Sequence, residues 1–382
     1  MTDMDLVHGT CGKEFVTVKT AFENNFTQGG ELGASFAFSL NGEIIIDLWG
    51  GYRDAARTKP WEKNTLCLVH SVTKIATALC AHILVDREQL DIDAPVCRYW
   101  PEFAQAGKEK ITVRQVMSHT SGVAGFDEPL APEDIYNWEY ITGLLEKQAP
   151  WWEPGTQCGY HGFTFGHIIG ELIRLVTGKT PGTFFREEVA EPLDIDFHIG
   201  LAAEEDDRTS DQIFSGMPGP GVPGYKSDDP DSISDRVQSN PSQTFDIFQT
   251  RAFRAAEIPA QNGYGNARSL ARMGALMACG GELDGIRLLS AEILYKATEE
   301  QFYGEDLVLR VPVRWGLGWG LGSKEIPLPG EHSFFWPGSK SIMVVDLDHR
   351  FCMAYVTNRV TTDAGQPYMG PFMALSNCFQ QS

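Results

Sequence analysis

The sequence predicts an α/β fold in which both ends of the chain build one antiparallel sheet and a mostly helical region is inserted between them. Two observations predict the sheet. Pairs of apolar, β-rich runs flank a polar turn within residues 34–54 and again within residues 341–359. A third observation predicts the insertion, because the middle of the chain carries apolar residues at helical spacing.

The elements follow in chain order. A helical pattern at residues 12–25 precedes the first strand pair, "ASFAFSLNGEIIIDLWGGYRD", which is centred on Asn41-Gly42. This dipeptide suits a type I′ hairpin turn, because both of its residues tolerate positive φ. The second pair, "SIMVVDLDHRFCMAYVTNR", precedes a helical pattern at residues 366–380. We therefore expect the two terminal helices to pack on the sheet.

Three further helical patterns lie in the middle of the chain, at residues 71–87, 163–177 and 270–281. We expect residues 1–68 and 285–382 to form the sheet domain and residues 69–284 the helical domain, with a cleft between them. A long irregular tract inside the insertion holds "EEDD" and "SGMPGPGVPGY" (residues 215–225). So many prolines and glycines exclude a regular element, and we interpret this tract as a flap or wall over a pocket.

Composition excludes several classes of function. The 382 residues carry a formal net charge of −20, which disfavours nucleic acid and anionic membranes as partners. The eight cysteines form no C-x-x-C pair and the nine histidines no H-E-x-x-H pattern, so we expect neither a metal nor a cofactor. No secretory signal or long apolar run is evident, and we expect a cytoplasmic protein. The oligomeric state is not predicted.

Ser71 and Lys74, in "LVHSVTKIATALCAHIL", lie one helical turn apart on the same side of a predicted helix. A lysine whose pKa is lowered by burial can take the proton of a serine hydroxyl and turn it into a nucleophile. The pair by itself is also what a helix start produces, with the serine as a cap and the lysine in solvent. The neighbouring segments of the sequence therefore have to distinguish a catalytic pair from an ordinary helix start.

Several segments in order resemble the serine β-lactamase and penicillin-binding-protein superfamily, and most closely its class C-like branch with the family VIII carboxylesterases. The segment after Ser71 continues as "DREQLDIDAPVCRYWPEF", and "ITVRQVMSHTSGV", "GYHGFTFGHIIGELIRLVTGKT", "NARSLARMGALMACGG" and "AYVTNR" follow it. The resemblance covers most of residues 60–360. It implies the serine β-lactamase-like (DD-peptidase) fold, with an active site in the cleft.

The resemblance also implies catalytic roles. Ser71 would be the nucleophile, Lys74 its partner and Tyr160 the third member. We expect mutual repulsion between protons to keep either Lys74 or Tyr160 deprotonated, so that this group accepts the serine proton. The oxyanion would be held by the backbone N–H of Ser71 and by a second N–H from Gly338 or Ser339, of which we prefer Ser339.

Two departures from the family pattern bear on the substrate. The β-lactamase motif Y-x-N reads Tyr160-His161-Gly162 here, so its asparagine is missing. The K-T-G motif is replaced by "WPGSK", in which Trp336 and Gly338 stand where the esterases carry W-G-G. Lys340 follows too late to replace the missing lysine, and we expect it to be solvated at the rim. We interpret His119 and His161 as structural or pocket-lining residues rather than general bases, and His70 is not expected to act on Ser71 because neighbours on a helix point about 100° apart.

These departures favour an uncharged ester over a carboxylate-bearing β-lactam. We expect a serine carboxylesterase for small short-acyl or aryl esters, with substrate contacts from Trp336, Gly338, His161 and Trp152. A β-lactamase, a D-amino-acid peptidase or amidase, and an acyltransferase of the same fold remain alternatives. A non-catalytic protein that only accepts an acyl group is a further alternative.

Overall fold

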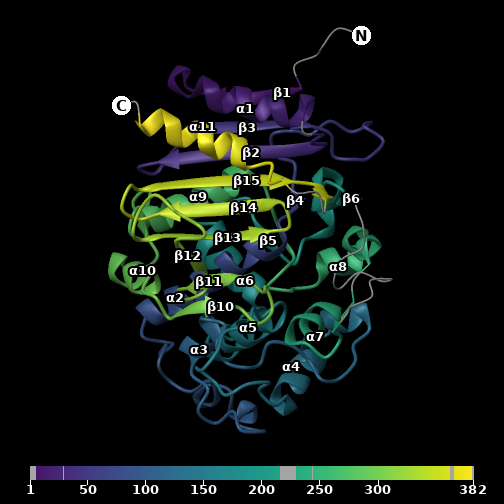
Figure 1. The fold of residues 1–382 in the computed structure, drawn as a ribbon, viewed down its shortest axis with the longest axis vertical. Helices are drawn as coiled ribbons and strands as arrows, with labels where there is room; N and C mark the ends of the chain where they lie inside the picture. The colour runs from purple at the N-terminus through teal and green to yellow at the C-terminus, as the bar shows by residue number, and fades with distance from the viewer. Residues whose placement is uncertain (1–5, 29, 216–228, 243, 362–364, 381–382) are drawn as a thin grey trace.

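A computed structural model describes residues 6–28, 30–215, 229–242, 244–361 and 365–380. Its centre is a nine-stranded sheet built from both ends of the chain, with every neighbouring pair antiparallel (Figure 1). In spatial order the strands are β1 (Val7–Cys11), β3 (Glu43–Gly51), β2 (Gly33–Leu40), β15 (Phe351–Thr357), β14 (Ser341–Asp346), β13 (Ser333–Gly338), β12 (Gly320–Leu321), β11 (Pro312–Trp315) and β10 (Phe302–Glu305). The predicted fold class and both predicted hairpins are confirmed.

The turn between β2 and β3 has the predicted geometry. Asn41 and Gly42 both adopt positive φ, at 51° and 88°. This is the requirement of a type I′ turn, whose twist matches that of the flanking strands. Glycine and asparagine adopt this conformation at little cost, so the dipeptide fixes the register of the hairpin.

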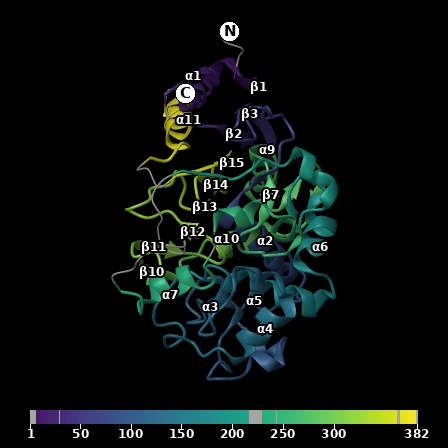
Figure 2. The same cartoon turned by 90° about the vertical axis from the view of Figure 1, so that its right-hand side faces the viewer.

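The two terminal helices, α1 (Val16–Thr27) and α11 (Met369–Gln380), lie side by side on one face of the sheet (Figures 1 and 2). Alternation along β2 explains how the faces divide. Phe36 and Phe38 join the hydrophobic cluster beneath these helices, whereas Ala37 belongs to the larger core on the opposite face. The prediction that both terminal helices pack on the sheet is therefore confirmed.

Helix α9 (Ala267–Ala278) covers the opposite face, against β2, β14 and β15. Its approach is close, because a Cβ added at Gly274 would lie 2.2 Å from Cys352 Sγ. The predicted helical domain includes this helix, but the helix packs on the sheet. The proposed division of the chain into two domains stays a prediction.

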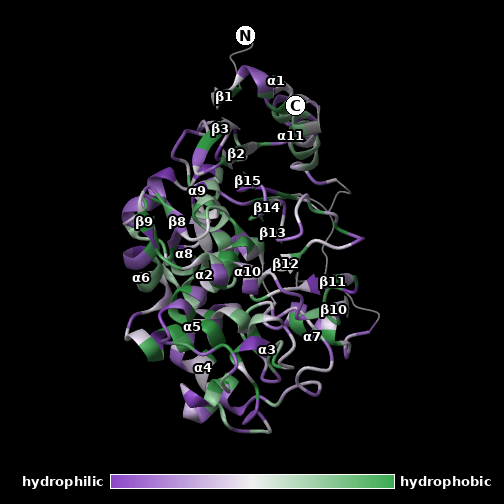
Figure 3. Cartoon of the chain, turned by 90° about the vertical axis from the view of Figure 1, so that its left-hand side faces the viewer, coloured by the Kyte–Doolittle hydropathy of each residue, from purple (hydrophilic) through white to green (hydrophobic). Residues whose placement is uncertain are grey.

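The rest of the insertion is mostly helical, as expected. Helices α2 (Thr73–Asp86) and α5 (Thr164–Thr177) pack against each other, and Figure 3 colours much of α5 as hydrophobic. One core joins the sheet to these helices, so β13 and β14 reach the start of α2. The remaining helices are α3 (Val113–Met117), α4 (Trp138–Lys147), α6 (Pro181–Phe185), α7 (Ile233–Ser239), α8 (Arg251–Ala255) and α10 (Ala291–Ala297).

The predicted flap or wall at residues 215–225 lies outside the described residues except for its first residue, which ends a short strand, β6 (Ile213–Ser215). Among the helices that are described, none has both the length and the apolar character needed to cross a membrane.

Candidate active site

Ser71 lies in a 3-10 turn, His70–Val72, that runs directly into α2. His70 has a φ of 48°, a left-handed conformation that non-glycine residues rarely adopt and that accumulates at functional sites. Thr73 stabilises this turn, because its Oγ1 donates to the His70 carbonyl and accepts from the N–H of Gly263 (2.8 Å). The strained turn presents the hydroxyl of Ser71 to a cavity.

Lys74 is buried one turn later, with 1% of its surface exposed. Its Nζ lies 3.4 Å from Ser71 Oγ and 2.9 Å from each of the carbonyl oxygens of Gly162 and Ala260. Burial lowers the pKa of Lys74 well below its usual range. A neutral amine has two N–H groups and one lone pair. With the two carbonyls taking both hydrogens, the lone pair is left for the Ser71 proton.

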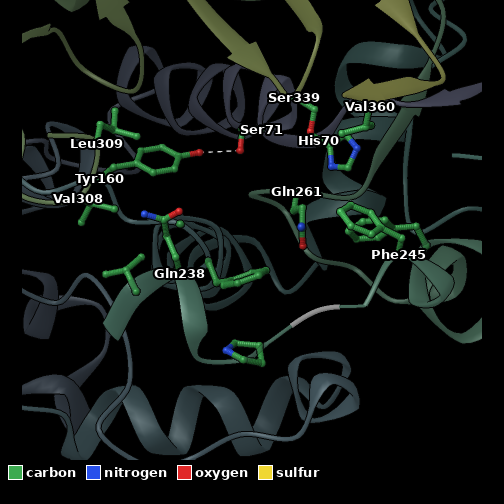
Figure 4. Close-up of a pocket in the computed structure, with 15 residues that line it drawn as sticks. His70, Ser71, Tyr160, Gln238, Phe245, Gln261, Val308, Leu309, Ser339 and Val360 are labelled. Atoms are coloured by element: carbon green, nitrogen blue, oxygen red, sulfur yellow. Dashed lines mark hydrogen bonds between the residues drawn. The ribbon is translucent and has the colours of Figure 1, made fainter. Parts of the chain in front are cut away.

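Tyr160 lies on the other side of the nucleophile, and its hydroxyl donates to Ser71 Oγ at 2.6 Å (Figure 4). The ring stacks on Trp336, with centroids 5.2 Å apart, and Lys74 Nζ is 4.5 Å from its centroid. Burial raises the pKa of the Tyr160 phenol above its usual range, so the hydroxyl keeps its proton. Burial thus shifts the two pKa values in opposite directions, which favours Lys74 over Tyr160 as the proton acceptor; their catalytic roles stay a prediction.

The structure thus brings together the three residues predicted to be catalytic. It also brings the end of β13 against the Ser71 turn. A Cβ added at Gly338 would lie 2.0 Å from the Val69 carbonyl oxygen and 2.8 Å from the backbone nitrogen of Ser71. Only glycine permits this approach. Ser339 follows with a φ of 55° and lines the same cavity as Ser71. Oxyanion binding by the N–H groups of Ser71 and Ser339 stays a prediction.

The cavity has a volume of about 330 Å³ and is largely apolar. In Figure 4, Tyr160 lies with Val308 and Leu309 on one side of Ser71, whereas Ser339 lies on the other side. Among the described residues, those that line it include no lysine, arginine, aspartate or glutamate: His70, Ser71, Tyr160, Gly162, Phe163, Val237, Gln238, Pro241, Phe245, Phe248, Gln261, Val308, Leu309, Ser339 and Val360.

The other predicted contact residues do not line this cavity. His161 is fully buried, with Nε2 2.6 Å from Ser121 Oγ and Nδ1 2.6 Å from the Gly159 carbonyl oxygen. Because both ring nitrogens already have partners, the geometry gives no support to the expected substrate contact of His161, which stays a prediction. Trp152 is buried in a small cluster, and its Nε1 donates to the Gln157 carbonyl.

Trp336 and Gly338 lie behind the residues that line the cavity. The Trp336 ring stacks on the Tyr160 ring, and Gly338 lies against the turn that carries Ser71. Lys340 corrects one expectation. It is buried rather than solvated, and its Nζ donates to the Gly365 carbonyl at 2.7 Å. The tight turn between β13 and β14 sets this direction, which alternation along a strand does not predict.

Sequence reasoning missed most of the cavity wall. Phe245 and Phe248 come from a short 3-10 helix, Phe245–Gln249, that no motif marks. Val308 and Leu309 come from the loop between β10 and β11. The only sign of these wall residues in the sequence is that they are apolar side chains within segments that show no helix or strand pattern. Within the described part of the chain, no cluster of three histidine, cysteine, aspartate or glutamate side chains is suited to a metal ion.

Comparisons with known proteins bear on the family and the fold of the chain. Residues 18–377 match the family described as Beta-lactamase. The chain is 34% identical over 334 residues to "Esterase/beta-lactamase LipL" of Mycobacterium tuberculosis, covering 82% of this chain and 74% of that protein. A crystal structure of a family VIII carboxylesterase has a TM-score of 0.88 and 37% identity over 97% of this chain and 99% of the other.

A penicillin-binding protein homologue from Caulobacter crescentus also has a TM-score of 0.88, with 34% identity over 97% of this chain and 99% of the other. These likenesses confirm the resemblance that the ordered segments around Ser71 indicated. They also confirm the serine β-lactamase-like fold. The chain therefore belongs to the beta-lactamase family.

Proposed function

We propose that this protein is a serine carboxylesterase that hydrolyses small, short-acyl or aryl esters through an acyl-Ser71 intermediate. The observation that carries the proposal is the hydrogen-bonded order Tyr160 hydroxyl, Ser71 Oγ, Lys74 Nζ, at 2.6 and 3.4 Å. A serine hydroxyl becomes a useful nucleophile only beside a base, and a neutral buried amine is such a base.

The proposed reaction begins with attack by Ser71 Oγ on the ester carbonyl carbon while its proton passes to Lys74 Nζ. The negative oxygen of the tetrahedral intermediate is bound by the N–H groups of Ser71 and Ser339. Collapse breaks the bond to the alcohol oxygen, which receives the proton from Lys74 through the Tyr160 hydroxyl. Water then attacks the acyl-serine by the same proton route in reverse, releasing the carboxylic acid.

The walls of the cavity favour an uncharged substrate. Its described lining residues offer aromatic and aliphatic side chains and no charged group to pair with a carboxylate. Burying an unpaired carboxylate is costly, whereas an alkyl or aryl ester gains from leaving water. The esterase names of the M. tuberculosis relative and of the family VIII structure support the same choice.

The test is hydrolysis of p-nitrophenyl acetate and butyrate by the wild type and by Ser71→Ala, with nitrocefin measured in the same buffer. We expect ester turnover that falls by about 10³-fold or more in Ser71→Ala, since removing a catalytic nucleophile has effects of that order. Nitrocefin should turn over slowly or not at all. Mass spectrometry of acid-quenched enzyme should find an acetyl group on the Ser71 peptide.

A matched control is Ser39→Ala. Ser39 is a fully buried serine on β2 whose Oγ donates to the Ala271 carbonyl of α9, and it does not line the cavity. Its replacement should leave kcat unchanged. Ester hydrolysis that survives in Ser71→Ala would exclude the proposed mechanism, and efficient nitrocefin turnover would favour a β-lactamase over the esterase.

A further inference from the structure

Asp306 is a fully buried acidic residue in the loop between β10 and β11 (residues 306–311). One of its oxygens, Oδ1, accepts three backbone N–H groups, from Tyr160 (3.0 Å), Val308 (2.9 Å) and Leu309 (2.9 Å). The other, Oδ2, accepts from Trp315 Nε1 at 3.3 Å. A carboxylate with several N–H partners is a strong and directional anchor.

The backbone of Tyr160 needs such an anchor. Residues 157–161 have no regular secondary structure, so no helix or strand fixes the position of this segment. Its neighbours are tied to His119, because Gly159 N donates to the His119 carbonyl and His161 N donates to His119 Nδ1. The N–H of Tyr160 itself is satisfied by a side chain 146 residues away in the sequence. A buried N–H that loses its partner moves or destabilises its segment.

Asp306 also influences the position of the Tyr160 ring indirectly, through the ring of Trp315. The Trp315 ring, whose N–H the carboxylate holds, lies parallel to the Tyr160 ring, with an angle of 3° and centroids 6.3 Å apart. Trp336 lies against both rings, with centroid distances of 4.7 Å to Trp315 and 5.2 Å to Tyr160. The same carboxylate therefore fixes the backbone of Tyr160 and one of the aromatic rings that flank its side chain.

The cavity wall depends on this carboxylate too. Val308 and Leu309 line the cavity beside Tyr160, and their N–H groups share Asp306 Oδ1 with the Tyr160 N–H. A displacement of the loop would thus displace the catalytic tyrosine, and the reverse also holds. Catalytic groups tolerate little displacement, since about 1 Å can cost on the order of 10²-fold in rate.

We propose that Asp306 is a positioning residue that holds the hydroxyl of Tyr160 against Ser71 and couples it to the Val308–Leu309 wall of the cavity. The inference rests on the proposed role of Tyr160 in ester hydrolysis. A purely structural role is the competing explanation, in which the carboxylate only closes the loop between β10 and β11.

A double-mutant cycle with Tyr160→Phe separates the two roles, because residues that act through one another are not additive. Asp306→Asn keeps the shape of the side chain but removes its charge. Its amide nitrogen is a hydrogen-bond donor, and it replaces a carboxylate oxygen that accepted an N–H group. We expect kcat for p-nitrophenyl acetate to fall about 10-fold in Asp306→Asn and about 100-fold in Asp306→Ser, with a smaller rise in KM because the Val308–Leu309 wall moves as well. In the Tyr160→Phe background both replacements should have almost no further effect on kcat.

The matched control is Asp346→Asn. Asp346 is also fully buried in the sheet, where it accepts hydrogen bonds from Ser333 and His349, remote from the cavity lining. The substitution Asp346→Asn should lower thermal stability without changing kcat. Rates are normalised by titrating Ser71 with a fluorophosphonate, so that only folded active sites are counted. If Asp306→Ser does not fold, the isosteric Asp306→Asn carries the cycle alone.

Two results would overturn the positioning role. One is a wild-type kcat in folded Asp306→Asn, and the other is an equal loss of kcat whether Asp306 is replaced in the wild type or in the Tyr160→Phe variant. These results differ from a failure of the proposed function, which would appear as ester hydrolysis that no longer depends on Ser71. If hydrolysis still depends on Ser71 and the losses are additive, only the role of Asp306 fails.

Discussion

The hydroxyl of Tyr160 lies 2.6 Å from Ser71 Oγ, although the two residues are 89 positions apart in the sequence. One begins a helix in the core, and the other lies in an irregular segment held by side chains from elsewhere in the chain. Their meeting is a product of tertiary packing.

Removing the phenolic hydroxyl tests proton transfer. Tyr160→Phe keeps the ring that stacks on Trp336, so substrate binding should be nearly unchanged. The hydrogen bond to Ser71 and the route to the leaving alcohol are lost, and we expect kcat to fall by about 10²- to 10⁴-fold. Steady-state kinetics with p-nitrophenyl acetate measure both constants. A large rise in KM with kcat preserved would contradict the assigned role.

The pH dependence of kcat/KM tests which group is the base. Burial lowers the pKa of Lys74 well below 10.5, so activity should rise with pH as Lys74 loses its proton and reach its plateau far below pH 10.5. The buried histidines should not contribute near neutrality, since burial lowers the pKa of His70 and of His161 to about 4. An acidic limb centred near the ordinary lysine value would show that Lys74 is protonated at rest.

Lys74→Arg gives a second measurement of the same base. A guanidinium stays protonated at every accessible pH and has no lone pair for the serine proton. We expect the variant to lose about 10²- to 10⁴-fold in kcat/KM at all pH values, with no recovery as the pH is raised. Recovery at high pH would mean that another group, with Tyr160 the first suspect, accepts the proton.

The sequence predicted those parts of the structure that local chemistry dictates. The hairpin at Asn41 and Gly42 follows from two residues that tolerate positive φ, and the helical spacing of Ser71 and Lys74 follows from the geometry of one turn. The start of α2 is slightly different, because Ser71 lies in a 3-10 turn and the α-helix begins at Thr73.

The parts that local chemistry does not dictate could not be predicted from the sequence. His161 follows Tyr160 directly, yet its ring is buried, with Ser121 and Gly159 as its hydrogen-bond partners. Lys340 is buried because a tight turn sets its direction. Asp306 belongs to no recognisable motif, and its carboxylate reaches Tyr160 only once β10 and β11 are in place. Long-range contacts of this kind leave little trace in a single sequence.

The close approach of β13 to the nucleophile predicts a steric effect at Gly338. In Gly338→Ala the new methyl group would meet the Val69 carbonyl oxygen and the backbone nitrogen of Ser71, so the strand must move. We expect a loss of about 1–3 kcal/mol in stability together with a fall in kcat, as the Ser339 N–H shifts away from Ser71. Thermal unfolding and p-nitrophenyl acetate kinetics measure the two effects.

The matched control for Gly338→Ala is Gly143→Ala in α4, where an added Cβ meets no atom within 4 Å. Alanine is the better helix former, and this change should raise stability by about 0.5–1 kcal/mol without altering kcat. If Gly338→Ala were equally harmless, the predicted oxyanion site would have to lie elsewhere.

Leu309 tests which part of the ester meets the wall beside Tyr160. Because Tyr160 protonates the leaving alcohol in the proposed reaction, the alcohol should lie on the side of Ser71 that Tyr160 and Leu309 share (Figure 4). Leu309→Ala removes apolar contact worth about 1 kcal/mol, which corresponds to a roughly 5-fold higher KM. We expect this rise for phenyl acetate and not for methyl acetate, whose alcohol is too short to reach the wall. Val311→Ala, on the exposed part of the same loop but outside the cavity lining, should change neither KM. An equal effect of Leu309→Ala on both esters would place the alcohol on the Ser339 side instead.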